Sequence, residues 1–189
     1  MKRLFDFVAS GCGLLVLSPV LILVAIWIKL DSKGPVFYRQ VRVGRYNKDF
    51  RIFKFRSMRV GADKGSLVTI GGRDPRITRS GYFIRKFKID ELPQLIYVFV
   101  GDMSLVGPRP EREYYIIQIM AKAPYYTLIH QVRPGITSWG MVKYGYASDV
   151  DGMVERLRYD LLYIENVSLL VDLKILFYTV QTVFTGKGI

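Results

Sequence analysis

Two adjacent carboxylates, Asp90 and Glu91, stand at the centre of the stretch whose residue types are best suited to chemistry. Pro93 follows them before an apolar run, so an ordinary helix start capped by Asp90 is one interpretation of the pattern. Cations surround the pair, with Arg85 upstream and Arg109 held between two prolines downstream. The stiff backbone around Arg109 lowers the entropy cost of aiming its guanidinium at a phosphate. Carboxylates inside such a cationic cluster predict a metal ligand or a nucleophile that acts on a phosphorylated substrate.

The chain as a whole is basic and rich in apolar residues. Its 189 residues carry a net charge of +12 and a sequence pI near 9.8. This predicts one domain, residues 1–189, and anionic partners such as nucleic acid, acidic lipid or a phosphorylated substrate. Cys12 is the single cysteine and His130 the single histidine, so neither an internal disulfide nor a zinc site is expected. No P-loop or dinucleotide-binding glycine fingerprint is present in the sequence.

The N-terminal segment has the composition of a membrane helix. Residues 7–28 contain no charged side chain, and at ~1.5 Å per residue a helix of that length can cross a bilayer core. Ser18 and Pro19 lie in the middle of the run, where proline removes an N–H group and kinks a helix. Basic residues flank both ends, and each flank favours the cytoplasmic side. A re-entrant helix with a break at Ser18-Pro19 satisfies both flanks, and a straight spanning helix is the alternative.

The remainder of the sequence predicts an α+β fold that is mostly helical. Residues 35–42 and 49–58 are rich in β-branched and aromatic residues and indicate a β-hairpin. On the second strand, Lys54 and Arg56 share one face, which points either to solvent or into an anion site. The last apolar stretch, residues 167–184, contains an aspartate and a lysine, so we expect an amphipathic helix on the membrane surface or against the core.

Several ordered motifs together resemble a known family, the monotopic phosphoglycosyl transferases, which are bacterial sugar transferases. No single motif is specific, but their order along almost the whole chain is. This sequence matches the minimal catalytic-domain form of that family. The motifs are Phe-Lys-Phe-Arg-Ser-Met (53–58), Asp-Glu-Leu-Pro-Gln (90–94), Gly-Asp-Met-Ser (101–104), Gly-Pro-Arg-Pro-Glu (107–111) and Val-Arg-Pro-Gly-Ile-Thr (132–137).

The resemblance implies an enzyme that moves a sugar 1-phosphate from a UDP-sugar to polyprenyl phosphate, usually undecaprenyl phosphate, and releases UMP. It implies that Asp90 is the nucleophile, forming a covalent phosphosugar intermediate, and that Glu91 binds Mg²⁺. A cation is needed there because an anionic carboxylate approaching a pyrophosphate is repelled by its charge. The resemblance further assigns phosphate binding to a set of basic residues, namely Arg56, Arg85, Arg109 and Arg133.

The resemblance also bears on topology and location. It implies that residues 1–30 form a re-entrant membrane helix and that residues 31–189 form a cytoplasmic catalytic part. The expected location is the cytoplasmic face of the bacterial inner membrane, with membrane lipids as partners and no nucleic acid. The expected role is the first membrane step in assembly of a glycoconjugate or polysaccharide.

Some questions stay open at the level of sequence. Many family members read Gly-Trp-Ala-Gln-Val-Asn-Gly-Arg where this chain has Ser-Trp-Gly-Met-Val-Lys-Tyr-Gly-Tyr at 138–146, which leaves the sugar, and with it the pathway, undetermined. A homodimer is neither required nor excluded. The competing hypothesis is a membrane-tethered protein that binds nucleic acid or acidic lipid through its positive charge. That hypothesis leaves Asp90 and Glu91 without a role.

Overall fold

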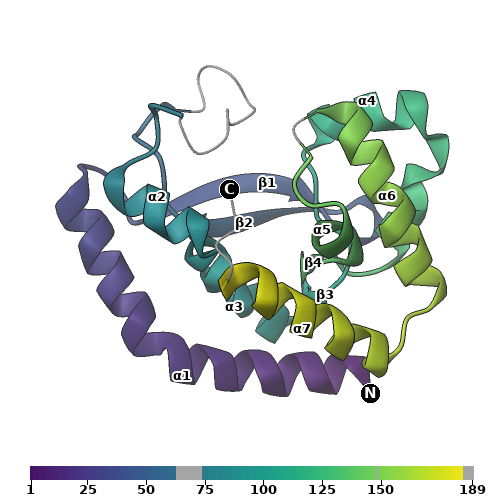
Figure 1. Cartoon of the computed structure of the whole chain (residues 1–189), viewed down its shortest axis with the longest axis horizontal. Helices are drawn as coiled ribbons and strands as arrows, with labels where there is room; N and C mark the ends of the chain where they lie inside the picture. The colour runs from purple at the N-terminus through teal and green to yellow at the C-terminus, as the bar shows by residue number, and fades with distance from the viewer. Residues whose placement is uncertain (63–73, 148, 185–189) are drawn as a thin grey trace.

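The computed structural model of the chain describes residues 1–62, 74–147 and 149–184. Helices dominate it, as the sequence predicts, and two small sheets complete it (Figure 1). The α-helices are α1 (Lys2–Asp31), α2 (Arg79–Lys86), α3 (Leu95–Val100), α4 (Glu113–Lys122), α5 (Trp139–Lys143), α6 (Val150–Glu165) and α7 (Leu169–Phe184). The short 3₁₀ segments are η1 (Arg45–Asn47), η4 (Ile89–Gln94) and η5 (Pro124–Gln131). The strands are β1 (Phe37–Val43), β2 (Asp49–Phe55), β3 (Ser104–Val106) and β4 (Gly135–Thr137).

The predicted hairpin is confirmed, and a second, parallel strand pair accompanies it. Strands β1 and β2 pair antiparallel, with Phe37 opposite Phe55. Strands β3 and β4 pair in parallel through Ser104 and Gly135. A Cβ atom at Gly135 would lie 2.1 Å from the backbone nitrogen of Gly107, so only glycine permits this approach. The close pairing fixes the segment that follows β3, and this segment carries Arg109.

Helix α1 is continuous through the predicted break and is bent. Pro19 lies inside the helix, and the Ser18 hydroxyl donates a hydrogen bond to the Leu15 carbonyl at 2.8 Å. Both features bend helices, because Pro19 has no N–H group to bond the Leu15 carbonyl four residues back, and the Ser18 hydroxyl bonds that same carbonyl instead. In Figure 1, α1 runs along the lower edge of the molecule and then rises steeply at the left. The sequence correctly located a helix distortion, which takes the form of a bend within one helix.

Both ends of α1 are held against the rest of the chain. At the N-terminal end, Lys2 Nζ lies 2.6 Å from Asp172 of α7, and the buried Asp6 accepts a hydrogen bond from the first side chain of β3. At the C-terminal end, the Asp31 carboxylate accepts a 2.8 Å hydrogen bond from the Ser80 hydroxyl of α2. The helix therefore returns to the body of the molecule at each terminus, while most of its apolar surface between them stays exposed.

The C-terminal helices divide between core and surface. In α6 the apolar residues Met153 and Leu157 are buried against α4 and η5, as expected for a core stripe. In α7, Ile175 is fully buried, whereas Leu170 and Phe177 are 80% and 71% exposed. Helix α7 is thus amphipathic, with one side in the core and an apolar side that nothing covers among the described residues.

Candidate active site

The two carboxylates lie in η4, a single 3₁₀ segment between α2 and α3. Lys88 precedes η4 in the left-handed backbone region, with φ of 57°, which turns the chain sharply after α2. Pro93 lies within η4, and α3 begins directly after it. Asp90 and Glu91 are 6% and 7% exposed. The local pattern is therefore a helix start, but Asp90 does not cap it, because neither η4 nor α3 has a side-chain cap hydrogen bond, and the turn instead buries two charged groups.

Glu91 is paired with Arg109. The Arg109 Nη2 group donates a hydrogen bond to Glu91 Oε1 at 2.9 Å. Burial raises the pKa of Glu91, but Arg109 and then Lys54 outweigh burial and bring that pKa to about 2. Arg109 also donates to the Met141 sulfur at 3.6 Å. Glu91 is thus held ionised by the arginine that the two prolines keep in place.

Asp90 has a different environment from its neighbour. Among the described residues, no group donates a hydrogen bond to its carboxylate. Burial raises the pKa of Asp90, the nearby Lys54 opposes this, and the ionised Glu91 raises it further, to about 6. A buried carboxylate without hydrogen bonds, largely ionised at neutral pH, is a competent nucleophile.

Lys54 and Lys88 both act electrostatically on Asp90 and Glu91. Burial lowers the pKa of Lys54, and the charges of Asp90 and Glu91 partly restore it. Burial likewise lowers the pKa of Lys88 to about 8, against the opposing effect of Glu91. The sequence left open whether Lys54 points to solvent or into an anion site. In the structure it lies in the charged site. Lys88, two residues before Asp90, is one of the cations that stand upstream of the carboxylate pair in the sequence.

A second group of buried ion pairs forms around Glu111, two residues after Arg109. Glu111 is 5% exposed and accepts hydrogen bonds from Arg42 Nη1 at 3.1 Å and Arg156 Nη2 at 2.6 Å. Burial raises the pKa of Glu111, and Arg156 and Arg42 lower it to a net value below the ordinary one. These residues come from β1, α6 and the segment after β3, so a single sequence offers no signal for their association.

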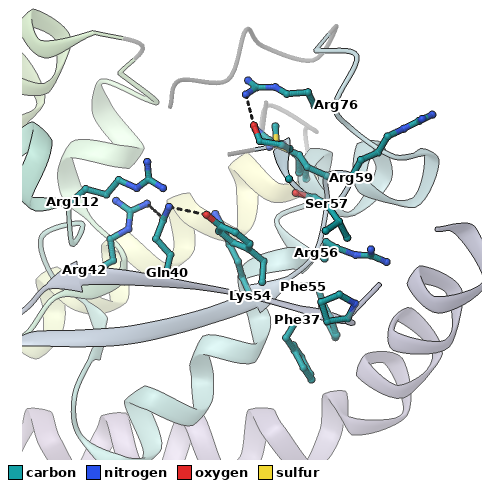
Figure 2. Close-up of a pocket in the computed structure, with 17 residues that line it drawn as sticks. Phe37, Gln40, Arg42, Lys54, Phe55, Arg56, Ser57, Arg59, Arg76 and Arg112 are labelled. Atoms are coloured by element: carbon teal, nitrogen blue, oxygen red, sulfur yellow. Dashed lines mark hydrogen bonds between the residues drawn. The ribbon is translucent and has the colours of Figure 1, made fainter. Parts of the chain in front are cut away.

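A cleft of about 380 Å³ opens beside the charged cluster. Figure 2 shows Arg42 and Arg112 near one end of it, Arg59 and Arg76 near the other, and Lys54 between them. Among the described residues, the lining holds many basic side chains and no acidic one. The basic residues are Arg42, Lys54, Arg56, Arg59, Arg76, Arg85 and Arg112. The cleft therefore favours a ligand with several negative charges.

The structure brings some of the expected phosphate-binding residues together and separates others. Arg85 lines the cleft and acts electrostatically on Asp90, as Arg109 does on Glu91. Arg56 also lines the cleft, but its guanidinium donates to the backbone carbonyls of residues 32 and 33, at the end of α1. Arg133 donates to the Gly101 carbonyl at 2.8 Å and lines another cavity, beside the N-terminus of α1.

The donor set suits a magnesium ion better than a transition metal. The described residues contain no group of three or more histidine, cysteine, aspartate or glutamate side chains that could enclose a metal. Mg²⁺ needs fewer protein ligands, because it is commonly held by one or two carboxylates and completes its coordination shell with water and substrate phosphates. Glu91 can provide such a carboxylate, since Arg109 bonds to only one of its oxygens, Oε1.

Comparison with known proteins gives matches along nearly the whole chain. Residues 1–186 match the family model described as bacterial sugar transferase. The UDP-N-acetylgalactosamine-undecaprenyl-phosphate N-acetylgalactosaminephosphotransferase of Aeromonas hydrophila is 44% identical over 188 residues, which cover 100% of this chain and 44% of that protein. The UDP-glucose:undecaprenyl-phosphate glucose-1-phosphate transferase of Escherichia coli (strain K12) is 40% identical, covering 100% of this chain and 41% of that protein.

A relative of similar length also matches. The Exopolysaccharide production protein PSS of Rhizobium leguminosarum bv. phaseoli is 40% identical over 200 residues, which cover 100% of this chain and 98% of that protein. The chain spans less than half the length of the two transferases named above. The similarity therefore concerns one region of those longer proteins.

Proposed function

The chain belongs to the bacterial sugar transferase family, and from this premise we propose that it transfers a sugar 1-phosphate from a UDP-sugar to undecaprenyl phosphate with release of UMP. The observation that carries the proposal is Asp90, a buried carboxylate that accepts no hydrogen bond from the described residues and is acted on by Lys54 and Arg85 of the cationic cleft. The names of two relatives identify UDP-N-acetylgalactosamine and UDP-glucose as their donors, which supports a UDP-sugar here.

The cleft is the proposed site for the donor's pyrophosphate. Lys54 and Arg85 belong both to the cleft and to the surroundings of Asp90, so a pyrophosphate bound between them lies next to the nucleophile. Arg109 is the third phosphate ligand in this proposal, because it already bonds Glu91 beside Asp90. The role of Arg56 is then indirect, since the carbonyls of residues 32 and 33, directly after α1, accept hydrogen bonds from its guanidinium, and the position of Arg133 supports no role at this pyrophosphate.

The proposed reaction has two displacements at one phosphorus. An Asp90 oxygen forms a bond to the sugar-bearing phosphorus, and the bond from that phosphorus to the bridging oxygen breaks, its electron pair leaving with UMP. An oxygen of undecaprenyl phosphate then attacks the same phosphorus and displaces Asp90 as a free carboxylate. Mg²⁺ bound through Glu91 would neutralise charge on the pyrophosphate and its leaving group. Burial keeps water from Asp90 and strengthens each of these interactions.

We propose a re-entrant path for α1, with both ends on the cytoplasmic side of the inner membrane. Both ends contact the part of the chain that holds the active site, through Lys2 with Asp172 and Asp31 with Ser80. A straight crossing would carry one end away from its partner and leave the buried Asp172 without its ion pair. The bend and the exposed apolar side chains of α1 and α7 support a helix that enters one leaflet and returns.

The test is UMP release by the purified chain with Mg²⁺, undecaprenyl phosphate and UDP-sugars that include UDP-glucose and UDP-N-acetylgalactosamine. We expect release with one or a few donors that depends on metal, and repeated turnover, beyond one UMP per chain, only when lipid phosphate is present. A control variant, Tyr125→Ser, should release UMP as the native chain does, because Tyr125 is an exposed aromatic residue of η5 outside the cleft. Absence of release from a folded, membrane-bound protein with every donor contradicts the proposal.

A further inference from the structure

Tyr146, in the segment between α5 and α6, contacts two cations of the active site with its ring. The Lys88 ammonium lies 3.4 Å from the ring centroid, and the Arg109 guanidinium carbon lies 5.1 Å from it. Both distances are within the range of cation–π attraction. Neither residue is near Tyr146 in sequence, so the chain folds a distant aromatic residue onto the cations that flank Asp90 and Glu91.

The backbone on both sides of this contact is unusual. Lys88 has φ of 57°, a left-handed conformation that costs free energy for a residue with a side chain and that needs support from its surroundings. Gly145, directly before Tyr146, has φ of 98°, which glycine alone adopts without strain. One turn thus directs the Lys88 side chain out of the α2–η4 connection, and the other turns Tyr146 back toward it.

An aromatic ring suits this position for an electrostatic reason. A carboxylate in place of the ring would hold Lys88 equally well, but it would cancel the positive charge that a phosphate needs. The ring attracts the cation through its quadrupole and carries no net charge. Lys88 and Arg109 therefore stay in place while keeping their charge for an anionic ligand.

We propose that Tyr146 is a positioning residue whose ring holds Lys88 and Arg109 beside Asp90 and Glu91, so that both cations meet the pyrophosphate of the donor. The proposal rests on the proposed function. It assigns the role to the ring and not to the hydroxyl, which has no hydrogen bond among the described residues. Tyr146 is 42% exposed, so it is not a core residue.

The first experiment compares variants of Tyr146 in steady-state UMP release. Tyr146→Leu should lower kcat/KM by about tenfold or more, and Tyr146→Phe should stay within about threefold of the native protein, because it keeps the ring. Tyr144→Leu is the matched control, an exposed tyrosine of the same segment without a cation contact among the described residues, and it should stay near native activity. Equal losses in the Phe and Leu variants, or an equal loss in the control, would overturn the proposal.

A double-mutant cycle separates positioning from a general effect on folding. If Tyr146 acts through the cations, Tyr146→Leu should change kcat/KM by only about threefold or less in a Lys88→Met background. A full, additive loss in that background would show that the ring does not act through Lys88, and so would overturn that part of the proposal.

A readout independent of activity is the rate at which acetic anhydride modifies Lys88, measured by peptide mass spectrometry relative to Lys122. Tyr146→Leu should raise this ratio and Tyr146→Phe should not, whereas an unchanged ratio in both would overturn the contact in solution. If the native chain releases no UMP while the ratio responds as expected, the proposed function fails and the contact stands. If UMP is released and the ratio does not respond, the proposed function stands and the positioning role fails.

Discussion

Replacing Arg109 by glutamine tests the ion pair at the centre of the site. Arg109 Nη2 lies 2.9 Å from Glu91 Oε1, and both side chains are largely buried. Glutamine keeps the first part of the arginine stem, but it is two bonds shorter and carries no charge. The substitution therefore removes both the positive charge and the hydrogen bond, and it leaves Glu91 as a buried carboxylate without its main counter-ion.

The magnitude follows from the pKa of Glu91. Burial raises that pKa, Arg109 and other cations lower it, and the net value is about 2 against an ordinary 4.5. At about 1.4 kcal/mol per unit, its folded surroundings favour ionised Glu91 by about 3 kcal/mol. Because the folded-state pKa is the lower one, this stabilisation is present above about pH 4.5 and is lost as the pH falls toward 2. Arg109 is the largest lowering cause, so most of the effect should disappear in Arg109→Gln.

The assay is thermal unfolding in nanodiscs at pH 7, followed by tryptophan fluorescence. A loss of about 2–3 kcal/mol corresponds to a Tm lower by about 5–10 °C in a chain of this size. The double variant Glu91→Gln, Arg109→Gln should be closer to the native Tm than the single variant, because no unpaired charge stays buried. A single variant within about 2 °C of native, or a double variant less stable than the single one, would refute the reasoning.

Three further outcomes are expected. The kcat/KM for the donor should rise as the pH passes about 6, where Asp90 ionises. It should fall above about pH 8, where Lys88 loses its proton. A flat profile from about pH 5 to 9 would contradict both assignments. Asp172→Ala should lower the free energy of unfolding by about 2–4 kcal/mol in chemical denaturation, because it leaves Lys2 of α1 and Tyr163 of α6 without their acceptor. A change below about 1 kcal/mol would argue against a stabilising role for these two hydrogen bonds. Ser18→Leu with Pro19→Ala should straighten α1 and move an N-terminal topology reporter to the periplasm, and a reporter that stays cytoplasmic would show that the bend does not determine the topology.

The parts of the fold that the sequence predicted correctly rest on local patterns. The hairpin of β1 and β2 follows from β-branched and aromatic residues on either side of a turn. The distortion of α1 follows from one proline. The pairing of β3 with β4 left no such signal, because two three-residue strands far apart in sequence are defined only by tertiary contacts.

The candidate site likewise contains residues that the sequence indicated and residues that it did not. Asp90 and Glu91 are adjacent, and Arg109 is marked by its two prolines, so the sequence alone indicated them. Lys88 and Tyr146 were missed as a pair because their contact depends on a left-handed turn and on the return of a distant segment. The sequence alone does not show which arginines face the cleft. Arg133, for example, donates a hydrogen bond to the backbone carbonyl of Gly101.

The most direct test of the central claim is the mass of the peptide that contains Asp90 after incubation with a UDP-sugar and Mg²⁺, without undecaprenyl phosphate. The account predicts a peptide heavier by one sugar phosphate, formed together with UMP and lost when undecaprenyl phosphate is added. Asp90→Asn should bind the membrane as the native protein does and show no adduct. UMP release that depends on lipid phosphate with no adduct at any time, or turnover that persists in Asp90→Asn, would contradict Asp90 as the nucleophile.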